Sequence, residues 1–210
     1  MIDKILSNLD WLGHDCFRLR AAGQVVYFDP FQLSGDLPPA DIILVSHAHY
    51  DHFSPDDIKK IRQKSTLIIT EPESAAKLSG NVQAMHPGQS ITWGPFTVEA
   101  VPAYNTNKKF HPQANNWLGY IVTVEGVRIY HAGDTDRIPE MANYQADIAL
   151  LPVSGTYVMT ADEAAQAALD INPKVAIPMH FGAIVGEQSD AERFAAKLVN
   201  KIKVHIPQKK

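Results

Sequence analysis

Residues 47–52 read His47-Ala48-His49-Tyr50-Asp51-His52, and this stretch guides the interpretation of the whole chain. It places three imidazoles and one carboxylate within six residues. In extended chain, side chains two positions apart point to the same side, so His47 and His49 can bind one metal ion together. Neutral imidazole is the commonest protein ligand for zinc and similar metals, and a carboxylate adds anionic charge. Asp51 and His52 are adjacent, so they diverge unless the chain turns, and a second ion could use that divergence.

The residues on either side of this stretch predict its setting. A short apolar run at 41–46 is typical of a strand buried on both faces, and it leads directly into His47. Ser54-Pro55-Asp56-Asp57 predicts the start of a helix, with proline at the first helical position and acids in the first turn. The stretch is therefore expected at the end of a strand, where α/β proteins commonly place their ligands.

Two later segments also end a predicted strand in a potential metal ligand. Asp134 follows the strand predicted at 127–130, after a turn at Gly133, and His180 follows the strand predicted at 175–177. Taken alone, Asp134 is more often a turn residue, His180 a buried histidine, and 47–52 a polar loop that happens to be rich in histidine. Their presence in one chain favours a shared metal site.

The rest of the chain predicts a mixture of strands and helices. Further strands are predicted at 17–19, 25–28, 66–70, around Ile91, and at 96–101, 118–124 and 148–151, with helices at 72–78, 161–169 and 190–199. Residues 21–24 fit a hairpin connection. No linker, repeat or low-complexity segment is found, so residues 1–210 are expected to form a single domain. Two packed sheets with helices outside are the expected architecture.

Composition and charge exclude several classes of protein. The net charge of -4, without a basic patch, argues against a nucleic-acid partner. Cys16 is the only cysteine, so a disulfide and a thiolate zinc cluster are excluded, and its place in a predicted strand indicates a packed residue. No signal peptide or membrane span is predicted, which is typical of a cytoplasmic protein. The expected partner is a small-molecule substrate, and the oligomeric state is left open.

The order H-x-H-x-D-H, then Gly133-Asp134-Thr135, then His180 resembles the metallo-β-lactamase superfamily, over essentially the whole chain. Trp11-Leu12-Gly13-His14 and Phe28-Asp29-Pro30-Phe31 resemble a branch of compact metal-dependent hydrolases. That branch is related to the ascorbate-6-phosphate lactonases and, more distantly, to the phospholipase D that cleaves N-acyl phosphatidylethanolamines. The resemblance implies an α/β (α+β) fold, a four-layer αββα sandwich. It also implies two divalent metal ions, with zinc favoured and manganese or iron as alternatives.

The resemblance further implies which residues bind the ions. His47 and His49 would hold the first ion, Asp51, His52 and His180 the second, and Asp134 would bridge them. The family normally supplies a third histidine to the first ion just after a central strand. Here Asn105 stands at that position, and the next histidine along the chain is His111. His111 is the candidate for the missing ligand; without it the first site would be weak and one well-held ion would remain.

Other residues carry smaller expectations. His14, Asn105 and Tyr157 are candidates for substrate binding, although packing is an equal alternative for Tyr157. Asp29 is a candidate partner for a ligand imidazole. Of the remaining polar residues, His131 is expected to be packed or to support a ligand, His86 and His205 to be structural or at the surface, and Lys108 and Lys109 to be solvated unless they attract an anionic substrate.

These features favour metal-assisted hydrolysis of a small ester, lactone or phosphodiester, with Asp51 orienting the attacking water and accepting its proton. Two alternatives remain: a non-catalytic metal or ligand sensor, favoured only by the departure at Asn105, and an iron-bound oxidoreductase of the same fold. Relatives with iron redox chemistry usually have glutamate where this chain has His49. A tRNA-processing nuclease and a true β-lactamase are disfavoured, because neither a basic insertion nor a secretion signal is found.

Overall fold

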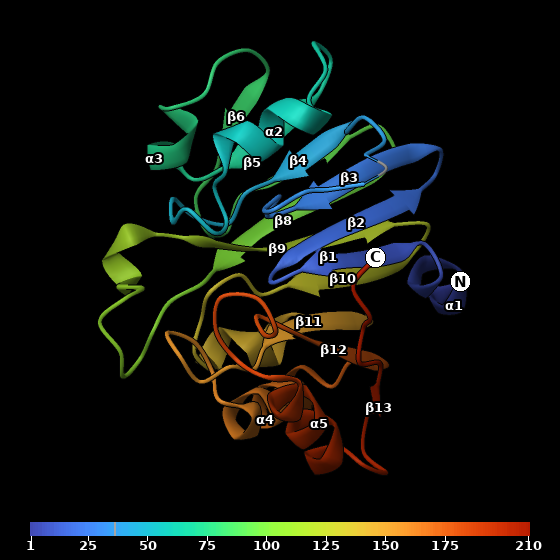
Figure 1. Ribbon diagram of the computed structural model, residues 1–210, viewed down its shortest axis with the longest axis vertical. Helices are drawn as coiled ribbons and strands as arrows, with labels where there is room; N and C mark the ends of the chain where they lie inside the picture. The colour runs from blue at the N-terminus through green and yellow to red at the C-terminus, as the bar shows by residue number, and fades with distance from the viewer. Residues whose placement is uncertain (36) are drawn as a thin grey trace.

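Two β-sheets pack face to face in the computed structural model, which describes residues 1–35 and 37–210 (Figure 1). The first sheet has the order β1-β2-β3-β4-β5-β6 and the second the order β13-β12-β11-β10-β9-β8-β7. The strands of the first sheet are β1 (Leu9–Gly13), β2 (Cys16–Ala21), β3 (Gln24–Phe28), β4 (Ile42–Leu44), β5 (Leu67–Thr70) and β6 (Val82–Ala84). Those of the second are β7 (Ser90–Trp93), β8 (Phe96–Pro102), β9 (Leu118–Val124), β10 (Val127–His131), β11 (Ile148–Pro152), β12 (Val175–Met179) and β13 (Lys203–Val204).

Helices cover the outer faces of both sheets, which completes the expected αββα sandwich. The helices α2 (Pro55–Ile61) and α3 (Pro72–Ala75) lie with the first sheet, and α4 (Ala161–Ile171) and α5 (Gln188–Lys197) with the second (Figure 1). A short α1 (Ile2–Leu6) precedes β1, and two 3₁₀ turns occur at Gln113–Asn115 and Pro139–Asn143. None of the helices in the described part of the chain could span a lipid bilayer.

Each sheet combines antiparallel and parallel pairing. In the first sheet β1, β2 and β3 pair antiparallel, whereas β3 to β6 pair parallel. In the second sheet β7 to β10 pair antiparallel, whereas β10 to β13 pair parallel. The C-terminal ends of neighbouring parallel strands meet at one sheet edge, and loops leaving that edge are the usual place for a site.

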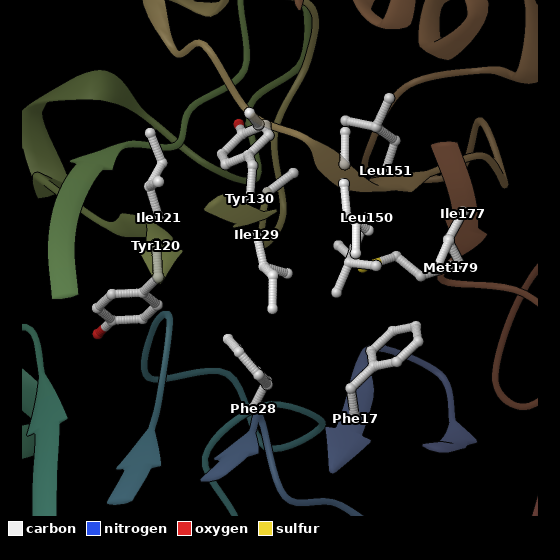
Figure 2. Packing of buried hydrophobic residues seen from close by; sticks show 14 of the residues in the cluster. Phe17, Phe28, Tyr120, Ile121, Ile129, Tyr130, Leu150, Leu151, Ile177 and Met179 are labelled. Carbon is white, nitrogen blue, oxygen red and sulfur yellow. The ribbon is translucent and has the colours of Figure 1, made fainter. Parts of the chain in front are cut away.

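The space between the sheets is filled by apolar side chains that alternate along each strand. Figure 2 shows Phe17 and Phe28 of the first sheet pointing toward Ile129 and Leu150 of the second. Leu151, the next residue after Leu150, points to the opposite face, toward the layer of α4 and α5. All five side chains are almost completely buried, so this core holds the strand ends rigidly.

Local sequence signals explain several element boundaries. Ser54 caps α2, its hydroxyl accepting a hydrogen bond from the Asp57 amide, as the sequence predicted. The hairpin between β2 and β3 turns through Ala22 and Gly23, both with positive φ, which matches the twist of the flanking strands. The predicted strand at 41–46 is shorter than expected, because only Ile42–Leu44 pairs in the sheet. The strands β1, β6 and β13 were not predicted.

Candidate metal centre

The stretch 47–52 follows β4 and turns back on itself at once. Hydrogen bonds run from the amides of His52 and Phe53 to the His49 carbonyl, at 3.0 and 2.8 Å. This tight turn separates the side chains of Asp51 and His52, as adjacent ligands require. The same turn ends just before Ser54, so the helix α2 fixes the exit of the segment.

Two groups of side chains converge at this end of the sandwich. We call His47, His49 and His111 the first ligand group; their ligand atoms and one from Asp134 all lie within 4.8 Å of one another. We call His14, Asp51, His52 and His180 the second ligand group, whose ligand atoms also lie within 4.8 Å of one another. The structure thus brings together every metal ligand expected from the sequence, and it adds His14.

The Asp134 carboxylate lies between the two groups. Its Oδ2 is 3.1 Å from His111 Nε2 and 3.9 Å from His47 Nε2, on the side of the first group. Its Oδ1 is 3.3 Å from both His52 Nε2 and His180 Nε2, on the side of the second group. One carboxylate therefore presents one oxygen to each group, which is the arrangement that a bridging ligand needs.

Asp134 reaches this position from a turn that only glycine can make. Gly133 has φ +60°, and a Cβ there would lie 2.8 Å from the Leu118 carbonyl oxygen and 3.0 Å from Ser46 Cβ. The strand β10 therefore ends directly against the segment that carries His47. This close approach connects the two sheets at the site.

Most imidazoles of the site are held through the ring nitrogen that faces away from it. Such partners fix the ring orientation and the tautomer, leaving the other nitrogen for a ligand. The pairs, at 2.8 to 3.0 Å from Nδ1, are His47 with Ser46 Oγ, His52 with Asp29 Oδ2, His111 with Asn105 Oδ1, and His180 with Ser154 Oγ. Asp29 thus lies against the imidazole of His52, one of the candidate ligands.

Asn105 holds His111 in place at several atoms. Its Oδ1 accepts hydrogen bonds from the His111 backbone amide and from Nδ1, each at 3.0 Å. The Asn105 backbone amide donates to the His111 carbonyl at 2.7 Å. Its Nδ2 donates to the Tyr157 carbonyl at 2.9 Å. With both side-chain atoms engaged, Asn105 faces His111, and the loop places His111 beside His47, His49 and Asp134.

Buried polar atoms at the centre test whether a cation fits. Within the described part of the chain, Nε2 of His52, His111 and His180 and Oδ1 of Asp134 are buried without a hydrogen-bond partner. An unsatisfied buried polar atom costs about 1–3 kcal/mol, so several in one place indicate a missing counterpart. All of these atoms are lone-pair donors in their neutral-imidazole or carboxylate forms, and divalent metal ions bind such atoms. The residues therefore fit divalent metal ions.

The protonation equilibria of the two groups differ. Burial lowers the pKa of His47 well below its usual value and also lowers the pKa of His49, which keeps both imidazoles neutral. Burial would raise the pKa of Asp134, but the charges of His52 and His180 hold it well below the usual range. Burial likewise opposes the charged form of His52, yet nearby Asp134 and Asp29 raise its pKa well above the usual value.

A cleft opens onto the site from solvent. Its volume is about 270 Å³, and its lining residues are His49, Tyr50, Asp51, Phe110, His111, Asp134, Tyr157, Ile184 and Val185. Asp51 is the carboxylate of the second group that reaches the cleft, while its Oδ2 lies 3.1 Å from His14 Nε2. A substrate in this cleft would meet residues of both groups.

The structure distributes the three expected substrate-binding residues differently. Tyr157 lines the cleft and is 40% exposed. Asn105 is turned away toward His111, and His14 is fully buried behind Asp51. His14, Asp29, Tyr157 and His180 all have positive φ, a costly conformation for non-glycine residues that is often found at functional sites.

Several other histidines and lysines lie outside the site. His131 is buried, its ring stacked on Phe28 with centroids 5.2 Å apart, and its Nε2 bonds the Asp15 carbonyl. Lys108 forms an ion pair with buried Asp136 at 2.5 Å, so it is not simply solvated. His86, His205 and Lys109 are exposed.

Sequence reasoning missed Asp15 and Trp117. Asp15 is completely buried, and one of its oxygens lies within 4.8 Å of ligand atoms from His52, Asp134 and His180. Burial raises the pKa of its carboxyl well above the usual range. Trp117 packs with ring centroids 4.7 Å from both His47 and His49. The position of Asp15 directly after His14 was an available signal; Trp117 had none.

Comparison with known proteins identifies relatives over most of the chain. Residues 8–180 match the family described as the beta-lactamase superfamily domain. A UPF0173 metal-dependent hydrolase of Thermococcus kodakarensis is 33% identical over 221 residues, covering 97% of each chain. One of Methanoculleus marisnigri is 32% identical over 206 residues, covering 89% of this chain and 86% of the relative.

Solved structures agree with this result. A candidate metal-dependent hydrolase from Parabacteroides distasonis is 35% identical with a TM-score of 0.86, covering 95% of this chain and 91% of that one. Igni18, a metallo hydrolase from Ignicoccus hospitalis, has a TM-score of 0.77 at 22% identity and covers 95% of this chain and 94% of its own. The second likeness concerns the fold alone.

Proposed function

This chain belongs to the beta-lactamase superfamily as a metal-dependent hydrolase, and from that premise we propose that it hydrolyses a small ester, lactone or phosphodiester at a two-ion site. The observation that carries the proposal is the Asp134 carboxylate, with one oxygen facing each ligand group at 3.1 to 3.9 Å. We assign His47, His49 and His111 to the first ion and Asp51, His52 and His180 to the second.

Two divalent ions, when bound, supply Lewis acidity that lowers the pKa of water and polarises the bond under attack. The protein residues position the reactants around that chemistry. Asp51 lines the cleft, and its Oδ2 lies 3.1 Å from His14 Nε2 and 3.8 Å from His52 Nε2. Oδ2 would therefore face the second ion, which leaves the other carboxylate oxygen to orient a water. That oxygen then accepts the proton of the attacking water and returns it to the leaving group.

The remaining residues keep the ligands in register. Asp29, Ser154 and Asn105 hold their imidazoles with Nε2 directed inward, so little rearrangement is needed on binding. Zinc is the ion we favour, because imidazole-rich sites suit it and it remains in one oxidation state; manganese and iron are compatible with the same ligands.

The test measures metal content and the hydrolysis of small esters, lactones and phosphodiesters, with protein purified without chelator. We expect two equivalents per chain and hydrolysis by the parent. His49→Ala should lose most of its turnover, whereas the matched control His205→Ala, at an exposed histidine, should retain it. Near-normal turnover in His49→Ala would contradict the assignment. Visible absorbance of the purified protein would favour an iron-bound oxidoreductase, and metal binding without hydrolysis of any tested ester, lactone or phosphodiester would favour a sensor.

A further inference from the structure

Exposed apolar side chains gather at the cleft. Seven large hydrophobic side chains are exposed in the described part of the chain, and four of them, Tyr50, Phe110, Tyr157 and Ile184, line this cleft. Their exposed fractions run from 39% to 67%. Single exposed apolar residues are ordinary, but their concentration at one opening marks a binding surface.

This apolar wall is held in a defined shape. The rings of Phe110 and Tyr157 meet edge to face with centroids 4.5 Å apart, and Tyr50 lies edge to face against Phe31 at 6.0 Å. Tyr157 has φ +70°, and its carbonyl is fixed by the hydrogen bond from Asn105. A wall ordered before binding loses less entropy when a ligand packs on it.

Among the described residues that line the cleft, none is lysine or arginine. Of the two lysines that the sequence offered, Lys108 is paired with the carboxylate of Asp136, and Lys109 is exposed but does not line the cleft. A phosphate or carboxylate on the substrate, away from the reacting bond, would therefore lie on apolar surface without a counter-ion, which is unfavourable.

We propose that the cleft binds an uncharged, apolar acyl or aryl group, so that the substrate is a carboxylic ester or lactone without a phosphate or second acidic group. This inference rests on the proposed hydrolytic function and narrows it. The cleft volume of about 270 Å³ equals that of about nine water molecules at about 30 Å³ each, which is enough space for a group such as hexanoyl or benzoyl. The acyl carbonyl lies at the ligand groups, and its chain lies along Phe110, Tyr157 and Ile184.

The first measurement compares kcat/KM for four p-nitrophenyl compounds with the metal-loaded protein. These are the acetate, the hexanoate, the adipate monoester and bis(p-nitrophenyl) phosphate. The adipate monoester has the same acyl length as the hexanoate but ends in a carboxylate. Each buried methylene contributes about three- to four-fold, so we expect the hexanoate to exceed the acetate at least about ten-fold. We expect a similar margin over the adipate monoester.

Substitutions of the apolar residues that line the cleft test whether this substrate preference arises there. Phe110→Ala should reduce the hexanoate-to-acetate ratio about ten-fold, whereas Val199→Ala, at an exposed apolar residue outside the cleft, should leave it unchanged. Ile184→Lys should raise kcat/KM for the adipate monoester relative to the hexanoate, because it supplies the missing cation. Metal content of each variant must match the parent, since Phe110 adjoins His111.

A binding measurement separates this inference from the proposed function. Calorimetric titration with N-phenylhexanamide, an unreactive neutral probe, should show binding that Phe110→Ala weakens and Val199→Ala does not. Binding without hydrolysis of any compound would support the apolar cleft and overturn the hydrolytic assignment. Metal-dependent hydrolysis with equal or better use of the adipate monoester or the phosphodiester, and no effect of Phe110→Ala, would overturn the apolar cleft and leave the hydrolase.

Discussion

The two ligand groups share Asp134 but are built differently. The first group takes His111 from the loop between β8 and β9, where hydrogen bonds with Asn105 hold it. The second group takes His52 from the turn after β4 and His180 from the end of β12, and buried Asp29 supports His52 at 2.8 Å.

The electrostatic consequence appears in the imidazole pKa values. In the first group burial lowers the pKa of both His47 and His49. In the second group burial also opposes charge, but nearby carboxylates, Asp134 foremost, raise the pKa of His52 and His180. The second group also has more carboxylates within 4 Å of its imidazoles, namely Asp29 and Asp51 as well as the shared Asp134. We infer that it binds a divalent cation more tightly and that the first group loses its ion more readily.

Replacing the shared carboxylate should have the largest effect. Asp134→Asn keeps the shape but removes the charge that faces both groups, so we expect loss of most bound metal and a fall in kcat of about 1,000-fold. Metal analysis and steady-state kinetics measure this, with circular dichroism as the check on folding. Asp56→Asn, at an exposed carboxylate, is the control. Retention of one full equivalent in Asp134→Asn would show that one group holds its ion without the shared residue.

Stepwise removal of metal tests the inferred order of affinity. As chelator concentration rises, one equivalent should leave well before the other, and Trp117 fluorescence should change with the first, because its ring adjoins His47 and His49. In His111→Ala only the tightly held equivalent should remain. Simultaneous loss of both equivalents in the parent would break the distinction between the groups.

The orienting residues should have intermediate effects, each in its own group. Asn105→Ala should lower the metal affinity of the first group about 10- to 100-fold, because it releases His111. Asp29→Asn should lower the metal affinity of the second group by a similar factor. Metal titration of each variant measures this, with Asn143→Ala, at an exposed asparagine, as control. If either variant weakened both equivalents alike, the two groups would be one coupled unit.

The smallest expected effect is on folding stability and involves Asp57, in the first turn of α2. The Asp57 carboxylate accepts hydrogen bonds from the amides of Gln32 and Leu33 and from Lys60. Burial would raise its pKa, but Lys60 and Ser54 hold it below the usual range. A lowered folded-state pKa means that the stabilisation is present above about pH 4 and is lost as pH falls through the folded value.

Asp57→Asn should therefore lower the free energy of unfolding by about 1 kcal/mol at pH 7, with the difference shrinking below about pH 4. Urea unfolding of the parent and the variant at pH 7 and below about pH 4 measures this difference. The metal affinity should not change. A constant difference across the pH range would mean that the charge of Asp57 is not responsible.

The sequence predicted the fold where apolar runs were continuous and the site where ligands followed them. Ile42–Leu44 and Val175–Met179 are fully buried strands; His180 follows the second directly, and His47 follows the first after Val45 and Ser46. The missed strand β6 is a short edge strand with mostly exposed residues, so it lacks the alternating pattern that signals a half-buried strand.

Other parts of the site were beyond sequence reasoning because they depend on contacts between distant segments. His111 is brought to the first group by loop closure around Asn105, which residue spacing does not reveal. Ser154 supports His180 across 26 residues, and Asp29 supports His52 across 23. Such pairings follow from the parallel strand order and become visible only once the sheets are assembled.

The close approach of the two sheets at Gly133 also affects how readily the folded protein opens and is degraded by proteases. Residues 47–52 come from the first sheet, whereas His111, Asp134 and His180 come from the second. Ions held between them would cross-link the two halves of the chain and would stabilise the folded state, because the assembled site exists only there. The supply of metal would then set resistance to proteolysis as well as turnover, and a metal-starved population would be cleared faster than a loaded one.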